Sequence, residues 1–328
     1  MKSKQFIGQQ RWQTYFEDIL LRGRYAHAYL FSGPRHLGKR TFVGILSRAI
    51  LCNERAGMAA CGRCFSCLLW RGKEHPDLAR LGLLDQATSI GVKEVRDFAA
   101  AIGKTPFVAK ERAVVIENLE DMTIEGANAL LKILEEPPAR TVLFLIAESA
   151  ARLPATVCSR LYHCLFTPVP RRDLVSALVS AKIDRARAAE LAALANGRPG
   201  LVWSWLENPK GLKAYQDRGA EFIKLCRGSL KERFSFVEYF LQNSGVSLAE
   251  CKKLLSHWRL VVRDFLVLRA NEPALISHTF LRPDLNSIAL DKELSGWLAF
   301  YDAAERTEQI ISRNANRRLA FNNLLLTL

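Results

Sequence analysis

Four of the eight cysteines in this 328-residue sequence have the spacing of metal ligands. Cys52, Cys61, Cys64 and Cys67 follow the pattern C-x8-C-x2-C-x2-C, and each C-x2-C turn presents two thiolates from one tight loop. Four thiolates at about 2.3 Å form the closed tetrahedral shell of structural zinc, which leaves no position for a reacting water. The spacing therefore predicts a zinc ion that holds residues 52–67 together. A redox or catalytic thiol is the alternative.

A second group of residues has the spacing of a phosphate-binding loop. Residues 33–39 read G-x-x-x-x-G-K between an expected strand and an expected helix, which is the context in which this motif binds nucleotides. Gly33 and Gly38 would let backbone N–H groups surround phosphate oxygens, and Lys39 would reach the terminal phosphates. The motif predicts a nucleotide-binding type of fold.

The parts of this site that would hydrolyse a nucleotide are incomplete. Arg40 stands where a Ser or Thr hydroxyl would bind magnesium, and Thr41 follows one residue too late, about 100° further around the helix. At the end of a neighbouring expected strand, Glu117 can serve as a magnesium ligand, but Asn118 cannot act as a general base. We therefore expect a degenerate site without hydrolysis, at which binding of ATP or ADP stays open. A loop that keeps its shape and binds nothing also fits.

The pattern of apolar residues predicts which elements position these groups. Over the first 165 or so residues, short apolar runs alternate with amphipathic stretches, which is typical of a parallel sheet covered by helices. The expected strands are 28–32, 78–81, 113–116 and 142–147, and the expected helices between them are 10–22, 40–51, 92–102 and 124–134. Helical spacing dominates from residue 171 onward, and the expected helices there are 171–195, 212–227, 230–243, 248–270 and 290–326.

Composition and charge limit the class of protein. Hydrophobic residues at 49% and charged residues at 24% exclude a disordered, collagen-like or coiled-coil chain. The formal net charge is +14, of which +10 falls in residues 1–204 and +4 in residues 205–328. An excess of this size indicates a polyanionic partner such as nucleic acid, although a merely solvated basic surface is the alternative. No apolar run reaches the roughly 18 residues that span a bilayer, so we expect a cytoplasmic protein without a membrane partner.

Several segments together resemble the delta-prime family of bacterial DNA polymerase III clamp-loader subunits. They are residues 6–9 (FIGQ), 27–34 (HAYLFSGP), 52–67, 74–77 (EHPD), 128–138 (NALLKILEEPP) and 314–316 (NAN). The resemblance implies an α/β plus all-α protein of the AAA+ type, with a RecA-like domain (1–166), a small helical lid (167–205) and a C-terminal helical collar (206–328). It also implies the partners of such a subunit: ATPase subunits of gamma/tau type and a delta subunit in a hetero-pentamer, the sliding clamp, and primer-template DNA.

The resemblance further implies that a subunit of this type acts as a stator, which offers an arginine to the ATP site of the next subunit within a Ser-Arg-Cys motif. Residues 158–161 read Cys-Ser-Arg-Leu, so Ser159 and Arg160 match and the cysteine does not. A guanidinium that reaches a γ-phosphate from outside stabilises the charge of the transition state. An ordinary ion pair at the surface is the alternative interpretation of Arg160.

Two other functions stay open. A motor ATPase of the same loader would be expected to keep Lys-Ser/Thr and Asp-Glu in the two nucleotide-site motifs, and this sequence has neither pair. A zinc-containing DNA-binding protein without a loader role would leave residues 128–138 unexplained. The sensor residues that ATPase relatives use have no clear counterparts near Glu148, Ser149 and Arg198, which agrees with an inactive site.

Overall fold

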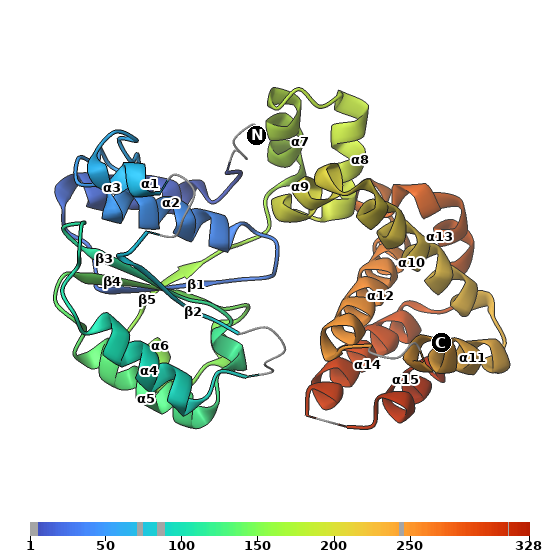
Figure 1. Ribbon diagram of the computed structural model, residues 1–328. Coiled ribbons are helices and arrows are strands. Elements are labelled where there is room, and N and C mark those ends of the chain that lie inside the picture. Colours follow the sequence, from blue (N-terminus) through green and yellow to red (C-terminus); the bar gives the residue numbers. More distant parts are fainter. Residues whose placement is uncertain (1–5, 71–74, 84–88, 243–245, 314) are drawn as a thin grey trace. The chain divides into compact units, whose positions relative to one another are not determined.

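The computed structural model of the protein describes residues 6–70, 75–83, 89–242, 246–313 and 315–328 (Figure 1). They form two compact units, Met1–Ala177 with Gly197–Gly200, and Leu178–Asn196 with Leu201–Leu328. The first unit is α/β and the second is helical, so the expected fold class of α/β plus all-α is confirmed. The division into three domains stays a prediction. Three residues of the sequence expectations, Glu74, Asn243 and Asn314, lie outside the described residues.

A five-stranded parallel sheet in the order β2-β3-β4-β1-β5 forms the centre of the first unit. Every residue of the three inner strands is buried, as expected for strands that are covered on both faces. The four predicted strands are confirmed to within one residue, and β5 was not predicted. The bounds are β1 (Ala28–Ser32), β2 (Leu78–Leu81), β3 (Arg112–Ile116), β4 (Thr141–Ile146) and β5 (Tyr162–Leu165).

Helices cover both faces of this sheet (Figure 1). One face carries α1 (Gln10–Arg22), α2 (Lys39–Leu51) and α3 (Phe65–Leu69), and the other carries α4 (Val92–Ile102), α5 (Ile124–Glu135) and α6 (Ala155–Cys158). Successive residues of β1 alternate between the two cores, because side chains along a strand point to opposite faces. Tyr29 and Phe31 enter an aromatic core beneath α1 and α2, and Ala28 and Leu30 enter an aliphatic core above α4 and α5. Short 3-10 turns η1 (Leu119–Asp121) and η2 (Ala150–Arg152) follow β3 and β4.

The second unit is helical throughout its described residues. Its largest buried side chains are aromatic and include Trp258, Phe265, Trp297, Phe300 and Phe321. Helix α7 (Arg171–Ser180) and helix α9 (Pro199–Glu207) cross the boundaries between the units. The remaining elements are α8 (Arg185–Ala195), α10 (Pro209–Arg227), α11 (Leu230–Gln242), α12 (Leu248–Arg269), η3 (Pro273–Leu275), η4 (Thr279–Leu281), α13 (Arg282–Ile288), α14 (Leu294–Ser312) and α15 (Arg317–Leu325). No helix among the described residues is both long enough and apolar enough to cross a bilayer.

Two of the expected helices were predicted wrongly, because each is divided into two helices in the structure. The expected helix 171–195 is divided into α7 and α8, because Lys182 adopts a left-handed φ of 66° and the Asp184 side chain caps α8 by accepting the N–H groups of Ala186 and Arg187. The expected helix 290–326 is divided into α14 and α15, and the Asn316 side chain caps α15. Helices α9 and α13 were not predicted.

Candidate functional site

The four cysteines that the sequence predicts as metal ligands lie together. Their Sγ atoms are all within 4.8 Å of one another, and the distances from Cys52 to Cys64 and from Cys61 to Cys67 are both 3.9 Å. A tetrahedron with bonds of about 2.3 Å has edges of about 3.8 Å, so this cluster has the dimensions of a closed zinc shell. The cysteines therefore fit a structural metal ion such as zinc.

Backbone N–H groups within this cysteine module (residues 52–67) point at the sulfur atoms. The N–H groups of Cys61 and Cys64 are each 3.3 Å from the sulfur of the preceding ligand, and that of Cys67 is 3.5 Å from the Cys64 sulfur. Burial raises the pKa of the Cys64 thiol, but the N–H donors of Cys67 and Asn53 outweigh it and lower that pKa to about 6. Such donors stabilise the thiolate, which is the form that binds metal.

Glu17 of α1 holds the first turn of the cysteine module. Its carboxylate accepts the N–H of Met58 at 2.8 Å. The preceding residue, Gly57, has a left-handed φ of 59°, and a Cβ added there would lie 2.0 Å from Glu17 Oε1. A side chain at position 57 would therefore have to displace the Glu17 carboxylate, and the left-handed φ also favours glycine there.

A chain of buried hydrogen bonds joins the module to the sheet. Ser66 of α3 is 2.9 Å from His75 Nε2 and donates its hydroxyl to the carbonyl of Leu51. His75 Nδ1 accepts the N–H of Asp77 at 3.1 Å, so Nε2 carries the proton and donates to Ser66. The Asp77 carboxylate accepts the N–H groups of residues 107–109 at 2.5 to 2.8 Å. The start of β2 and the segment before β3 are thereby fixed to α3.

The predicted phosphate loop lies between β1 and α2. Gly33 has a φ of 138°, and a Cβ there would lie 2.3 Å from the carbonyl oxygen of Phe166, so the loop needs glycine at this position. Gly38 precedes α2 with a φ of 90°. Lys39 is buried, and its ammonium donates to the carbonyls of Gly33 and Pro34. Burial and two nearby arginines lower the pKa of Lys39 to about 8. In this chain Lys39 is bonded to carbonyls of its own loop.

Arg40 forms an ion pair with the residue predicted as a magnesium ligand. Its Nη2 atom is 2.7 Å from Glu117 Oε2 and 3.1 Å from Asn118 Oδ1. Arg80 approaches the same carboxylate from β2, at 3.7 Å. Thr41 is exposed on the next position of α2. The carboxylate that a magnesium ion would need is therefore neutralised by cations of the same chain.

One residue at the unassigned sensor position, Glu148, contacts the phosphate loop. Glu148 forms an ion pair with Arg35 of the loop, and its N–H donates to Glu120 at 3.3 Å. Burial raises the pKa of the Glu120 carboxyl group. Ser149 precedes η2, and Arg198 lies in the segment that joins α8 to α9. The sequence motifs did not indicate Arg35 and Glu120, because their residue types are not part of the nucleotide-binding pattern.

Arg160, the predicted arginine finger, follows α6. Its Nη2 atom is 2.6 Å from Oε1 of Glu135, the last residue of α5, and its Nη1 donates to the Thr156 carbonyl at 2.9 Å. The Ser159 hydroxyl donates to the same carbonyl at 3.0 Å. The Arg160 side chain is 37% exposed, so it is accessible at the surface and is held there by an ion pair. The sequence motif did not indicate Glu135 as this partner.

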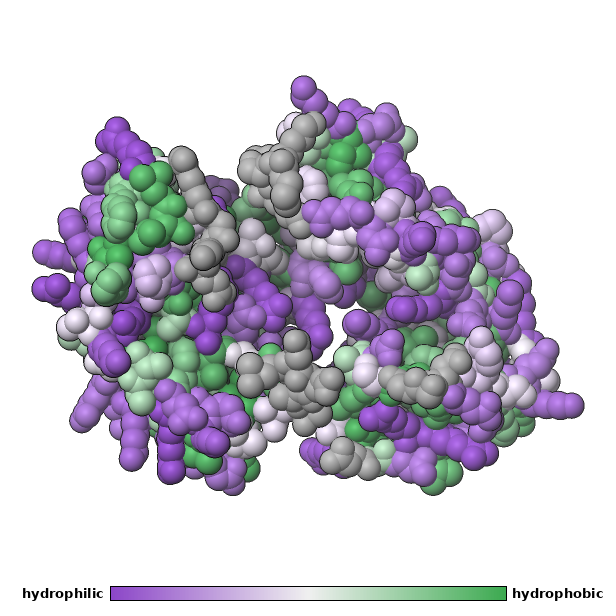
Figure 2. All heavy atoms as spheres, viewed as in Figure 1, coloured by the Kyte–Doolittle hydropathy of each residue, from purple (hydrophilic) through white to green (hydrophobic). Residues whose placement is uncertain are grey.

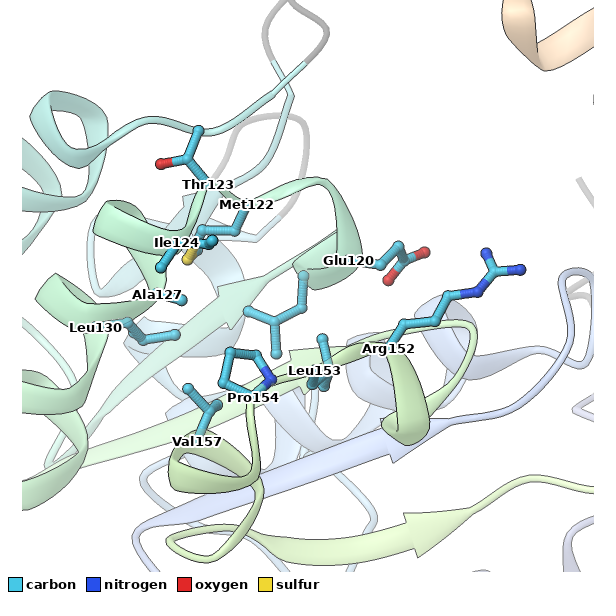
Figure 3. Close-up of a pocket in the computed structure, with 11 residues that line it drawn as sticks. Glu120, Met122, Thr123, Ile124, Ala127, Leu130, Arg152, Leu153, Pro154 and Val157 are labelled. Atoms are coloured by element: carbon cyan, nitrogen blue, oxygen red, sulfur yellow. The ribbon is translucent and has the colours of Figure 1, made fainter. Parts of the chain in front are cut away.

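A small cavity of about 110 Å³ lies between the start of α5 and α6 (Figure 3). Apolar side chains such as Met122, Leu130 and Val157 line it, and Glu120 and Arg152 lie to one side of them (Figure 3). Pockets for small molecules usually have volumes of about 300–1,000 Å³, so this cavity is too small for a nucleotide. None of the predicted site residues lines it.

The fold and these sites define a class of protein. A parallel sheet with a phosphate loop after a central strand, joined to a helical unit, is the architecture expected of an AAA+ protein, and here Arg40 forms an ion pair with Glu117, the predicted magnesium ligand. Residues 8–170 match the family model described as "DNA polymerase III, delta subunit". Over this half of its length, the chain belongs to that family.

The relatives to which this chain is similar in sequence include DNA polymerase III subunits. It is 36% identical over 192 residues to the DNA polymerase III subunit delta' of Pseudomonas aeruginosa, with 57% of this chain and 58% of the relative covered. It is 34% identical over 180 residues to the subunit delta' of Escherichia coli, with 54% of each chain covered. The chain therefore matches less than two thirds of the length of these relatives. Among solved structures, a DNA polymerase III gamma subunit-related protein of Thermotoga maritima has a TM-score of 0.46 and 16% identity, with 96% of this chain and 97% of that chain covered.

Proposed function

We propose that this protein is a delta-prime-like clamp-loader subunit that does not hydrolyse ATP. It assembles with ATPase subunits of gamma/tau type and a delta subunit, and it helps to place a sliding clamp on primed DNA. The observation that carries the proposal is the ion pair between Arg40 and Glu117, together with membership of the DNA polymerase III delta subunit family.

The chemistry of magnesium supports the absence of hydrolysis. A magnesium ion that bridges phosphates needs a hydroxyl from the phosphate loop and a carboxylate from the neighbouring strand. Arg40 replaces the first and pairs with the second at 2.7 Å. A guanidinium stays charged at any physiological pH, so the pair persists wherever the protein works. Asn118 offers no base for a water, which favours the stator over a motor ATPase.

Arg160 is the residue that we propose to act in a neighbour's ATP site. Its guanidinium is partly exposed, and its ionic partner Glu135 is itself 49% exposed. Exposed ion pairs contribute only about 0–1 kcal/mol, so a γ-phosphate with a higher charge can displace Glu135 at low cost. Ser159 would keep the turn before Arg160 in place through its bond to the Thr156 carbonyl.

A zinc ion in the cysteine module would be structural. Four thiolates would hold it and leave no open position, so we assign it no step in the reaction. Its role would be to hold residues 52–67 against α1 and the sheet.

Two measurements test the proposed function. The isolated protein should hydrolyse ATP no faster than a Lys39→Ala variant, and a clear difference would favour the motor ATPase. In a loader reconstituted with its ATPase subunits, Arg160→Ala should slow DNA-stimulated ATP hydrolysis and leave assembly intact. Arg22→Ala is the matched control, because Arg22 is an exposed arginine that pairs with Asp18 in the same unit. Loss of assembly in the Arg160→Ala loader alone would make Arg160 a structural residue.

A further inference from the structure

Helix α3 presents apolar side chains to solvent at the edge of the first unit. Phe65 is 66% exposed and Leu68 is 42% exposed, and residues three apart lie on the same side of a helix. Figure 2 shows hydrophobic side chains gathered over α3 with hydrophilic ones around them. Exposed apolar side chains that form a patch with a polar rim mark interaction sites on folded proteins.

The backbone of α3 is held firmly, so the exposure of Phe65 does not come from a loose segment. The Cys64 side chain caps α3 by accepting the N–H of Cys67. Ser66 is buried and bonded to His75 and to the carbonyl of Leu51. A binding side chain on such a fixed element loses little conformational entropy on contact with a ligand.

A second exposed aromatic ring belongs to the same edge of the sheet. Phe107 is 85% exposed, and its N–H donates to Asp77 at 2.5 Å. Asp77 is bonded to His75, which is bonded to the neighbour of Phe65 in sequence. Asp77 and residues 107–109 precede β2 and β3, which pair in parallel, so both rings lie near the amino ends of these strands. The phosphate loop follows the carboxyl end of β1, at the opposite edge.

The charge around these rings is positive. Residues 48–70 and 103–112 contain six lysines and arginines against two carboxylates, so they carry +4 of the chain's +14. The two carboxylates, Glu54 and Glu111, are both in ion pairs with arginines of the same segments. Four of the six cations are exposed, and one of them, Arg63, pairs with Glu54. The other three are Arg48, whose guanidinium lies 5.3 Å from the centre of the Trp70 ring, Lys104 and Lys110.

We propose that Phe65, Phe107, Arg48, Lys104 and Lys110 form an aromatic-basic surface that binds single-stranded DNA. Exposed rings stack on unpaired bases, and cations beside them contact the phosphates. A duplex offers no free base face to either ring, so the surface selects single strands. The positive charge favours a polyanionic partner over a neutral protein, and the two exposed rings favour one with unpaired bases. This inference adds a separate DNA contact to the proposed function, at the edge opposite the phosphate loop.

The test uses the full chain and a fluorescent oligothymidine longer than about 16 nucleotides, the upper range of site sizes for a single-strand binding domain. Phe65→Ala and Phe107→Ala should each weaken binding about 5-fold or more, the lower limit for loss of one stacked base. The double variant Lys104→Gln/Lys110→Gln should reduce the slope of log K against log salt by about 1.4, since each phosphate contact on a single strand contributes about 0.7. An unlabelled duplex should compete poorly.

Tyr239→Ala is the matched control, because Tyr239 is 68% exposed on the second unit. Zinc content and circular dichroism would show that each variant is folded. Wild-type affinity in both phenylalanine variants would overturn the proposal. So would a loss of loader assembly in these variants with unchanged DNA binding, which would make the surface a protein interface. The tests of ATP hydrolysis and of Arg160 do not use this surface, so failure here leaves the proposed function standing.

Discussion

The guanidinium of Arg40 lies 2.7 Å from the carboxylate of Glu117, so the two departures from the nucleotide-site pattern meet in one ion pair. Arg40 occupies the position of a magnesium-binding hydroxyl, and it contacts the side chain that would hold the same ion from the neighbouring strand. The Arg40 side chain is 66% exposed. Because the Arg40 end of the pair is exposed, we expect that Arg40 can be replaced without unfolding the protein.

The variant Arg40→Ser should gain magnesium-dependent nucleotide binding. The serine would restore the hydroxyl ligand and release Glu117 from its main partner. Calorimetric titration with ADP should give tighter binding in magnesium than in EDTA for the variant, by about 10-fold or more, the effect of roughly 1.4 kcal/mol. Hydrolysis of ATP should stay absent, because Asn118 remains. An identical affinity in magnesium and EDTA would show that Arg40 is not what blocks the ion. Arg48→Ser, on the same helix, is the control.

The buried Lys39 should make stability depend on alkaline pH. Burial lowers its pKa in the folded chain from about 10.5 to about 8. Between these values the unfolded chain binds the proton and the folded chain does not, so the stability of the wild type rises with pH from 8 to 10.5. Below pH 8 both states are charged and this contribution is constant. The free energy of unfolding of Lys39→Met, measured relative to that of wild type, should be highest below pH 8. This difference should fall by on the order of 3 kcal/mol by pH 10.5. Urea unfolding at several pH values measures the difference, and a constant difference would contradict the shift.

Much of the first unit could be predicted because its inner strands are continuous apolar runs. Strands β1, β3 and β4 are buried on both faces, which leaves the same signal in the sequence. Strand β5 pairs with β1 at the edge of the sheet, and three of its four residues are exposed. Its signal is broken by His163, which the fold satisfies with Ser32 at 2.6 Å. The break between α7 and α8 had a local signal, the Asp184 cap, that continuous helical spacing of alanine and leucine concealed.

The candidate sites also differ in how much of each could be predicted from the sequence. The four cysteines fall within sixteen residues, so spacing alone indicated that they converge. The pairs Arg40 with Glu117 and Arg160 with Glu135 each join residues that only the fold brings together. Sequence motifs identified one or both members as candidates, but the ion pair depends on strand order and helix position, which no local pattern encodes.

The variant Gly57→Ala should destabilise the cysteine module by more than the strain of its left-handed backbone alone. Gly57 has a φ of 59°, and a Cβ would lie 2.0 Å from Glu17 Oε1. Gly23→Ala is a matched control, because Gly23 has a φ of 65° and nothing lies within 4 Å of an added Cβ. Both variants carry the left-handed strain of about 1 kcal/mol, and only Gly57→Ala also displaces Glu17. Gly57→Ala should therefore show the larger fall in melting temperature and faster release of zinc to a chelator. Equal effects in the two variants would mean that Glu17 does not hold the module.

The bond between His75 and Ser66 should make the stability of the first unit depend on acidic pH. Burial lowers the pKa of His75, and the nearby Asp77 only partly opposes it. As pH falls below the ordinary value of about 6.5, the unfolded chain takes up a proton that the folded chain does not, so the contribution of His75 is complete above that pH and is lost below it. His75→Gln should cost about 1 kcal/mol at pH 7.5, the value of one buried hydrogen bond, and the difference from wild type should shrink between pH 6.5 and 5. Urea unfolding of both proteins at these pH values measures this difference in stability. Protonation of the cysteines affects both proteins alike and so cancels in the difference. A difference that grows as the pH falls would mean that His75 is charged in the folded protein.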